Sequence, residues 1–132
     1  MHFASIRIIT EDVARIVKFY ETATRVPATW STDDFAEIIT PNATLALAGT
    51  RTVQLLGDQA PPPAANQSVI IEFRVAHVDA EYDRLKEFDI HMVNEPTTMP
   101  WGNRSLLFRD PDGNVVNFFT PVTPEAIKRY GH

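Results

Sequence analysis

The stretch IEFRVAHVDAEYDRL, residues 71 to 85, follows the same plan as SIRIITEDVARIVKFY, residues 5 to 20. Each begins with alternating apolar residues, a pattern typical of a strand with one buried face. Each then passes through a polar step into apolar residues three or four apart, which form one apolar face of a helix. Val78 opens the second helical pattern 65 residues after Val13 opens the first. The correspondence indicates an internal duplication.

The segments after each predicted helix also correspond. TLALAGTRTVQLLG (residues 44–57) and SLLFRDPDGNVVNFF (residues 105–119) are each predicted to form two strands joined by a tight turn. Matching Gln54 to Asn117 gives an offset of 63 residues. The stretch GDQAPPPAANQS between the halves is rich in proline, which a sheet interior does not accept, and it is predicted to be a linker. Each half therefore has the order βαβββ, a repeat of about 60 residues.

Composition limits the possible classes of function. The chain has 132 residues, 44% of them hydrophobic and 22% charged, as expected for one globular domain. The net charge of -5 provides no basic surface, so nucleic acid is not an expected partner. The absence of cysteine excludes disulfides, thiolate nucleophiles and Cys-based metal sites. No signal peptide and no apolar run of about 20 residues is apparent, so we expect a cytoplasmic protein that does not enter a membrane.

The stretch MPWGNRSLLFRDPDGNVVNFFTPV, residues 99–122, resembles the last hairpin of the vicinal-oxygen-chelate superfamily, the glyoxalase, bleomycin-resistance and extradiol-dioxygenase group. That hairpin usually reads W-G-x-R followed by D-P-D-G-N. EDVARIVKFYE, residues 11–21, resembles the first helix of the family, and the resemblance covers nearly the whole chain. It implies an α+β fold in which two βαβββ modules form an open, curved barrel around a cleft.

The expected organisation is a single domain over residues 1–132. Its parts are module one at about 1–57, a linker at about 58–67, module two at about 68–122 and a C-terminal helix, TPEAIKRYGH, at about 123–132. Edge strands and apolar rims of an open barrel need cover, so a homodimer is expected. Whether the cleft forms within one chain or between two is left open.

Metal-binding members of the family hold a divalent cation through four side chains, one from the first and one from the last strand of each module. The resemblance places Ser5, Gln54, Ile70 and Asn117 at these positions. Hydroxyls and neutral amides are weak donors, and Ile70 has no lone pair. The four histidines lie elsewhere, at His2, His77, His91 and His132. We therefore expect neither a metal nor another cofactor.

Strand parity predicts which side chains line the cleft. The predicted set is Ser5, Arg7, Ile9, Thr52, Gln54, Leu56, Ile70, Glu72, Arg74, Val115, Asn117 and Phe119. Apolar walls with a few polar groups are typical of a small-molecule pocket. The resemblance places Trp101 at the mouth, where it either stacks on a flat ligand ring or forms a hydrophobic lid. Trp30 is assigned either to the same mouth or to a dimer contact.

Arg7 and Glu72 occupy matching places in the two halves. Charges on an enclosed sheet face nearly always pair, so we expect an ion pair between them. In the alternative, Arg7 or Arg74 receives the carboxylate or phosphate of a ligand.

The sequence favours a metal-free protein that binds a planar or amphipathic small molecule. The alternative is an enzyme, a lyase, isomerase or dioxygenase of the glyoxalase type. Such an enzyme either works without metal, with Glu72 as the catalytic acid or base, or has a non-standard metal site.

Overall fold

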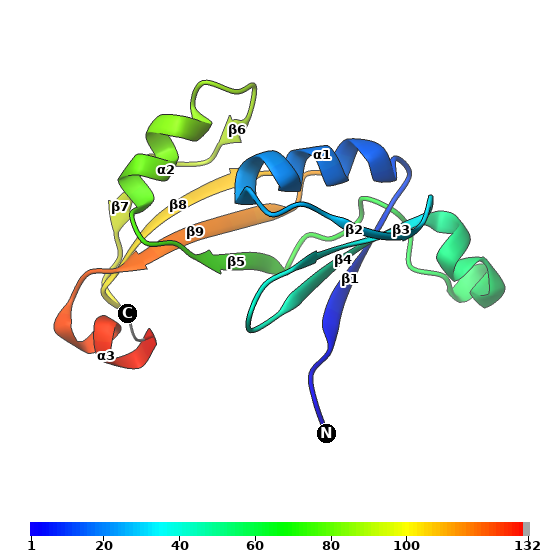
Figure 1. Ribbon diagram of the computed structural model, residues 1–132, viewed down its shortest axis with the longest axis horizontal. Helices are drawn as coiled ribbons and strands as arrows, with labels where there is room; N and C mark the ends of the chain where they lie inside the picture. The colour runs from blue at the N-terminus through cyan, green and yellow to red at the C-terminus, as the bar shows by residue number, and fades with distance from the viewer. Residues whose placement is uncertain (131–132) are drawn as a thin grey trace. The chain divides into compact units, whose positions relative to one another are not determined.

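The computed structural model describes residues 1–130 and has a mixed α+β fold, as predicted. The chain forms two compact units, one from Met1 to Asn66 and one from Gln67 onward. Each unit contains one open sheet with helices (Figure 1). The open, curved barrel and its cleft stay a prediction. None of the helices in the described part of the chain is long and apolar enough to cross a bilayer.

The first unit has the strand order β1-β4-β3-β2, with β1 parallel to β4 and the other neighbours antiparallel. Its elements are β1 (Ser5–Thr10), α1 (Val13–Thr24), β2 (Thr29–Thr32), β3 (Phe35–Ile39), β4 (Thr44–Gly49) and the 3-10 segment η1 (Thr50–Gln59). Asp12 caps the start of helix α1, and its carboxylate accepts a hydrogen bond from the Arg15 backbone N–H at 3.1 Å. Ile16 and Tyr20 on its apolar face are fully buried.

The second unit has the strand order β5-β9-β8-β6, and the short strand β7 also pairs with β8. Its elements are β5 (Ile70–Arg74), α2 (Val78–Leu85), β6 (His91–Met92), β7 (Thr97–Thr98), β8 (Asn103–Arg109), β9 (Val115–Pro121) and α3 (Pro124–Tyr130). The C-terminal helix is therefore present. Its two last predicted residues, Gly131 and His132, lie outside the described residues.

Helix α2 covers one face of the second sheet. Phe108 and Phe118 on that face pack edge to face with ring centroids 5.0 Å apart, and both are buried. Val78 and Leu85 are the buried residues of the helix. Arg104 extends from the same face and pairs with Asp79 in the first turn of α2, with Nε 2.8 Å from Oδ2. The opposite face of this sheet therefore remains for other contacts.

The D-P-D-G-N motif forms a turn that is held by hydrogen bonds within the motif. The Asp110 carboxylate accepts hydrogen bonds from the backbone N–H groups of Asp112 and Asn114, both at 2.9 Å. The Asn114 side chain donates to the other Asp110 oxygen at 2.8 Å. Gly113 has φ +86°, a left-handed conformation that glycine adopts without strain. This motif, the most specific part of the resemblance, thus has a structural role between β8 and β9.

The W-G-x-R motif connects β7, β8 and α3. The Gly102 carbonyl accepts hydrogen bonds from the backbone N–H groups of Val122 at 2.9 Å and Thr123 at 3.3 Å. Gly102 has φ +94°, and a Cβ at this position would lie 2.0 Å from Thr123 Oγ1. Only glycine therefore allows the turn to lie this close to the start of α3.

The predicted strand that contained Gln54 is wrong. Strand β4 ends at Gly49, and the next ten residues form η1. The Thr52 hydroxyl donates to the Gly49 carbonyl at 2.8 Å and closes the first turn, while Val53 packs against Ile9 and Ala48. The alternation of polar and apolar residues in this segment is typical of a strand. Burial of Val53 against the sheet instead favours the helical turn.

The observed strand pairing also changes the predicted correspondence between the two units. Arg7 on β1 pairs with Ala46 on β4, and Glu72 on β5 pairs with Asn117 on β9. Since both pairs join the first strand of a unit to its parallel neighbour, Ala46 corresponds to Asn117. The offset is 71 residues, from 46 to 117, in place of the predicted 63.

Candidate functional site

The side of the second sheet away from α2 carries most of the predicted ligand-binding residues, and we call it the candidate face. Ile70, Glu72 and Arg74 pair directly with Val115, Asn117 and Phe119, so all six lie on this face, which confirms the predicted strand parity. The pairing of β8 with β9 adds Ser105, Leu107 and Arg109, which the sequence reasoning missed. The same parity rule applied to β8 would have found them.

Asn117 and Glu72 form a hydrogen-bonded pair at the centre of the candidate face. The Asn117 Nδ2 donates to Glu72 Oε2 at 2.8 Å. Asn117 is only 8% exposed, whereas Glu72 is exposed. The Asn117 Oδ1 is buried and has no hydrogen-bond partner among the described residues. The amide in this apolar strand therefore donates a hydrogen bond to a carboxylate, which a second carboxylate at the same position would repel.

The two arginines of the candidate face both have backbone partners. Arg74 Nη1 donates to the Tyr130 carbonyl of α3, and Arg109 Nη1 donates to the Gly113 carbonyl at 2.8 Å. The contact of Arg74 connects β5 to α3. If Arg74 instead receives an anionic ligand group, its guanidinium has to serve both the ligand and this contact. The sequence does not predict this contact, because it depends on where α3 packs.

Helix α3 covers one end of the candidate face, on the side of the sheet opposite α2 (Figure 1). The rings of Phe119 and Tyr130 pack edge to face with centroids 5.0 Å apart. Trp101, in the turn before β8, is 66% exposed. A large exposed ring is available for stacking on a flat molecule, and the two roles predicted for Trp101 stay open.

In the first unit, Ser5 and Arg7 are exposed on β1, and Gln54 is exposed on η1. Arg7, Ala46 and Glu37 lie side by side on three neighbouring strands and share a face of the sheet. The expected ion pair between Arg7 and Glu72 joins residues of different units and stays a prediction.

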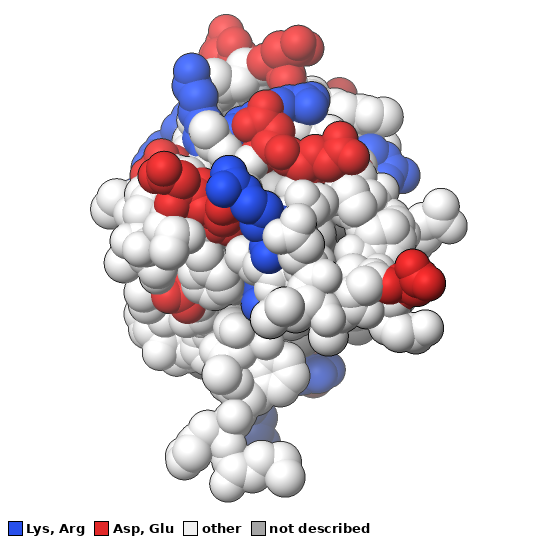
Figure 2. All heavy atoms as spheres, turned by 90° about the vertical axis from the view of Figure 1, so that its right-hand side faces the viewer, with Lys and Arg blue, Asp and Glu red and all other residues white. Residues whose placement is uncertain are grey.

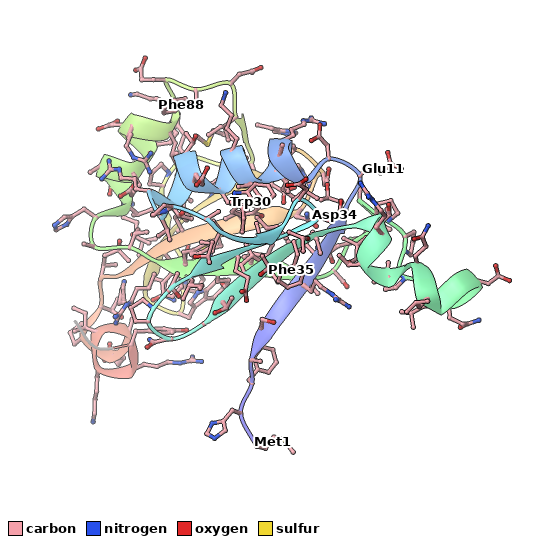
Figure 3. The ribbon with its side chains drawn as sticks, turned by 45° about the vertical axis from the view of Figure 1, so that its right-hand side comes forward. Met1, Glu11, Trp30, Asp34, Phe35 and Phe88 are labelled. Carbon is pink, nitrogen blue, oxygen red and sulfur yellow. The ribbon has the colours of Figure 1, made fainter. Side chains whose placement is uncertain are left out.

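Trp30 and Phe35 lie on opposite faces of the first sheet. Trp30 pairs with Ala36 on β3, so it shares a face with Ala36, whereas the adjacent Phe35 projects to the other side. Figure 3 labels both side chains on β2 and β3. Trp30 is 45% exposed. The two rings therefore do not line one surface of this sheet, and the two roles predicted for Trp30 stay open.

The histidines and the surface charges add no further site to the described residues. His2, His77 and His91 are exposed, and His132 lies outside the described residues. In residues 1–130, no group of three or more histidine and acidic side chains is placed to hold a metal ion. On the face that Figure 2 shows, acidic and basic side chains lie next to one another. Arg51 and Asp34 in the first unit form an ion pair, with Nε 3.1 Å from Oδ2.

The duplicated order of strands and the turns at the W-G-x-R and D-P-D-G-N motifs match one class of proteins. The chain belongs to the Glyoxalase/Bleomycin resistance protein/Dioxygenase superfamily, whose family model matches residues 2–118.

Individual proteins resemble this chain in sequence, in fold or in both. The chain is 26% identical over 131 residues to an uncharacterised protein of Bacillus subtilis (strain 168), YraH, with 90% of this chain and 98% of that protein covered. A solved structure described as a conserved domain protein is 27% identical, with a TM-score of 0.75 and coverage of 92% of this chain and 99% of that chain. A glyoxalase-related enzyme from Fulvimarina pelagi is 15% identical, with a TM-score of 0.76 and coverage of 95% and 94%. At that identity, the last likeness concerns the fold alone.

Proposed function

We propose that this protein is a metal-free small-molecule binding protein of the glyoxalase/bleomycin-resistance type, with a planar or amphipathic ligand held against the candidate face. The observation that carries the proposal is the hydrogen bond between Asn117 and Glu72. The family resemblance implies a glutamate at the position of Asn117 in metal-binding members, and the Asn117 amide is bonded to Glu72. The polar centre of the face is thus arranged as a hydrogen-bonding site.

The donor set at the family's metal positions supports the same proposal. Ser5 contributes a hydroxyl, Asn117 an amide and Ile70 a hydrocarbon. We assign the fourth position to Ala46 in place of Gln54, and Ala46 contributes only a methyl group. A divalent cation in a catalytic site needs imidazole or carboxylate ligands, usually three. These residues do not fit one.

The apolar part of the candidate face suits the body of such a ligand. Ile70 is 50% exposed and lies next to Val115. Leu107 is partly exposed beside Asn117. Binding sites for small molecules combine such apolar walls with a few polar groups that fix orientation.

Native mass spectrometry of protein purified without a metal-affinity tag tests the proposal. We expect a species without a tightly held metal and with a co-purified or added organic molecule. Stoichiometric zinc, nickel or iron would contradict it.

The same spectrum reports the number of subunits, and we propose a cytoplasmic homodimer. Edge strands β1 and β5 carry Ile6 and Ile70, 43% and 50% exposed, and such edges usually need cover. A monomer at micromolar concentration would contradict the dimer.

A second candidate is a metal-independent lyase or isomerase in which Glu72 is the acid or base. Its support is the exposure of the Glu72 carboxylate and the fixed orientation that Asn117 gives it. Turnover of a candidate substrate that disappears in Glu72→Gln would favour this function over binding alone. An enzyme of the same family with a non-standard metal site would instead show metal-dependent turnover.

A further inference from the structure

At the centre of the candidate face, the buried side-chain atom without a hydrogen-bond partner is an acceptor. Asn117 uses its Nδ2 to bond Glu72 Oε2 at 2.8 Å, and its Oδ1 is buried without a donor among the described residues. Glu72 is exposed. A buried carbonyl oxygen without a donor has lost its bond to water and received none in return, so a donor that reaches it is favoured.

The orientation of the Asn117 amide follows from its neighbour. A rotated amide would place its oxygen against the Glu72 carboxylate, and two acceptors at that distance repel each other. The N–H side therefore faces Glu72, and the oxygen is the atom left for another molecule.

The cations on the same face favour a ligand that donates hydrogen bonds over an anionic one. The guanidinium groups of Arg74 and Arg109 already donate to backbone carbonyls, those of Tyr130 and Gly113. An anion at the centre of the face would meet the negative charge of Glu72. A cation meets an exposed carboxylate and an unused carbonyl oxygen.

We propose that the ligand is an organic cation with N–H donors, an amidinium, guanidinium or primary ammonium group on an apolar body. This inference rests on the proposed function. The exposed Glu72 carboxylate receives the cationic group first, and the buried Asn117 Oδ1 accepts a second N–H once the side chains adjust. The apolar body lies against Ile70, Val115 and Leu107, which surround the pair on the same face.

Benzamidine and benzoate form a matched pair of probes, since each joins a planar group to the same ring, one as a donor cation and the other as an acceptor anion. Both are titrated into ¹⁵N-labelled protein while the side-chain amide signal of Asn117 and the backbone signals of β5 are followed. We expect benzamidine to shift these signals and to bind more tightly than benzoate. Because a hydrogen bond to a charged group is lost, Glu72→Gln should weaken benzamidine on the order of tenfold or more.

Glu87→Gln is the matched control, because it makes the same chemical change at an exposed position just after α2. It should leave the benzamidine affinity unchanged. Asn117→Leu should weaken benzamidine as well. If Asn117→Leu fails to fold, Glu72→Gln and the comparison of the two probes in the unaltered protein still decide the question.

Benzoate that binds this face as tightly as benzamidine would overturn the inference and leave the proposed function standing. The same holds if benzamidine binds equally well to the unaltered protein, Glu72→Gln and Asn117→Leu. If neither probe shifts any signal of the candidate face, the inference fails. The proposed function fails with it only if native mass spectrometry also finds no organic ligand.

Discussion

Asn117→Asp tests the pairing at the centre of the candidate face most directly. The substitution places a second carboxylate where the Asn117 amide now donates to Glu72 at 2.8 Å. The variant loses a hydrogen bond to a charged group, worth about 1.5–3 kcal/mol. It also gains repulsion between two like charges. For charges about 4 Å apart this repulsion is about 1 kcal/mol in water, and the value for water applies because Glu72 is exposed. We expect the free energy of unfolding at neutral pH to fall by about 2.5–4 kcal/mol.

Urea denaturation at several pH values measures this change. Mutual repulsion raises the pKa of one carboxyl in the variant, because the two groups then share a proton. A group whose folded-state pKa is raised contributes stability below its unfolded pKa and loses it as the pH rises through the folded value. The deficit of Asn117→Asp should therefore shrink near the ordinary carboxyl pKa of about 4.

Exchange of the two groups provides the control. In the double variant Glu72→Gln with Asn117→Asp, the amide stands on β5 and the carboxylate on β9, so one donor again faces one charged acceptor. We expect it to regain most of the stability lost in Asn117→Asp, which a double-mutant cycle with Glu72→Gln quantifies. An Asn117→Asp variant as stable as the original protein at neutral pH, or a double variant no better than the single one, would refute the pairing.

Gly102→Ala should lower the free energy of unfolding by about 3 kcal/mol or more, because it adds a clash with Thr123 to the cost of a left-handed residue. Gly113→Ala, at φ +86° with open space around it, should cost only about 1–2 kcal/mol, and equal losses in urea denaturation would contradict the close contact. The hydrogen bond from Arg104 lowers the pKa of Asp79, so this pair stabilises the fold above the ordinary carboxyl pKa and loses its effect as the pH falls through the lowered value. Asp79→Asn should remove that part of the acid dependence of unfolding, and an unchanged pH profile would show that the pair contributes nothing.

Local pattern was enough to predict the second unit's face. The alternation of β5 and β9 placed Ile70, Glu72 and Asn117 on one side of the sheet, and the pairing of these strands confirms it. That Glu72 and Asn117 are direct neighbours did not follow, because it depends on the parallel pairing of strands 45 residues apart in the sequence. Parity decides the side on which a residue lies, whereas long-range pairing decides its partner.

The error at Gln54 has a different origin. The segment after Gly49 alternates well enough for a strand, and no local signal opposes that interpretation. Its helical turn is stabilised by burial of Val53 against Ile9 and Ala48, which are distant in the sequence or belong to the preceding strand. The contact of Arg74 with Tyr130 likewise depends on the packing of α3. Tertiary contacts overrode local pattern in both places.

The self-contained turn at Asp110 makes the hairpin of β8 and β9 tolerant of change. The bonds that hold the turn run among Asp110, Asp112 and Asn114, and the turn at Gly102 is likewise held through backbone groups. Neither turn uses the side chains of Asn117 or Leu107 on the strands between them. Substitutions at Asn117 or Leu107 can therefore alter what is bound without loosening the ends of the hairpin. Such separation of scaffold from chemistry lets one architecture acquire new ligands by a few point mutations.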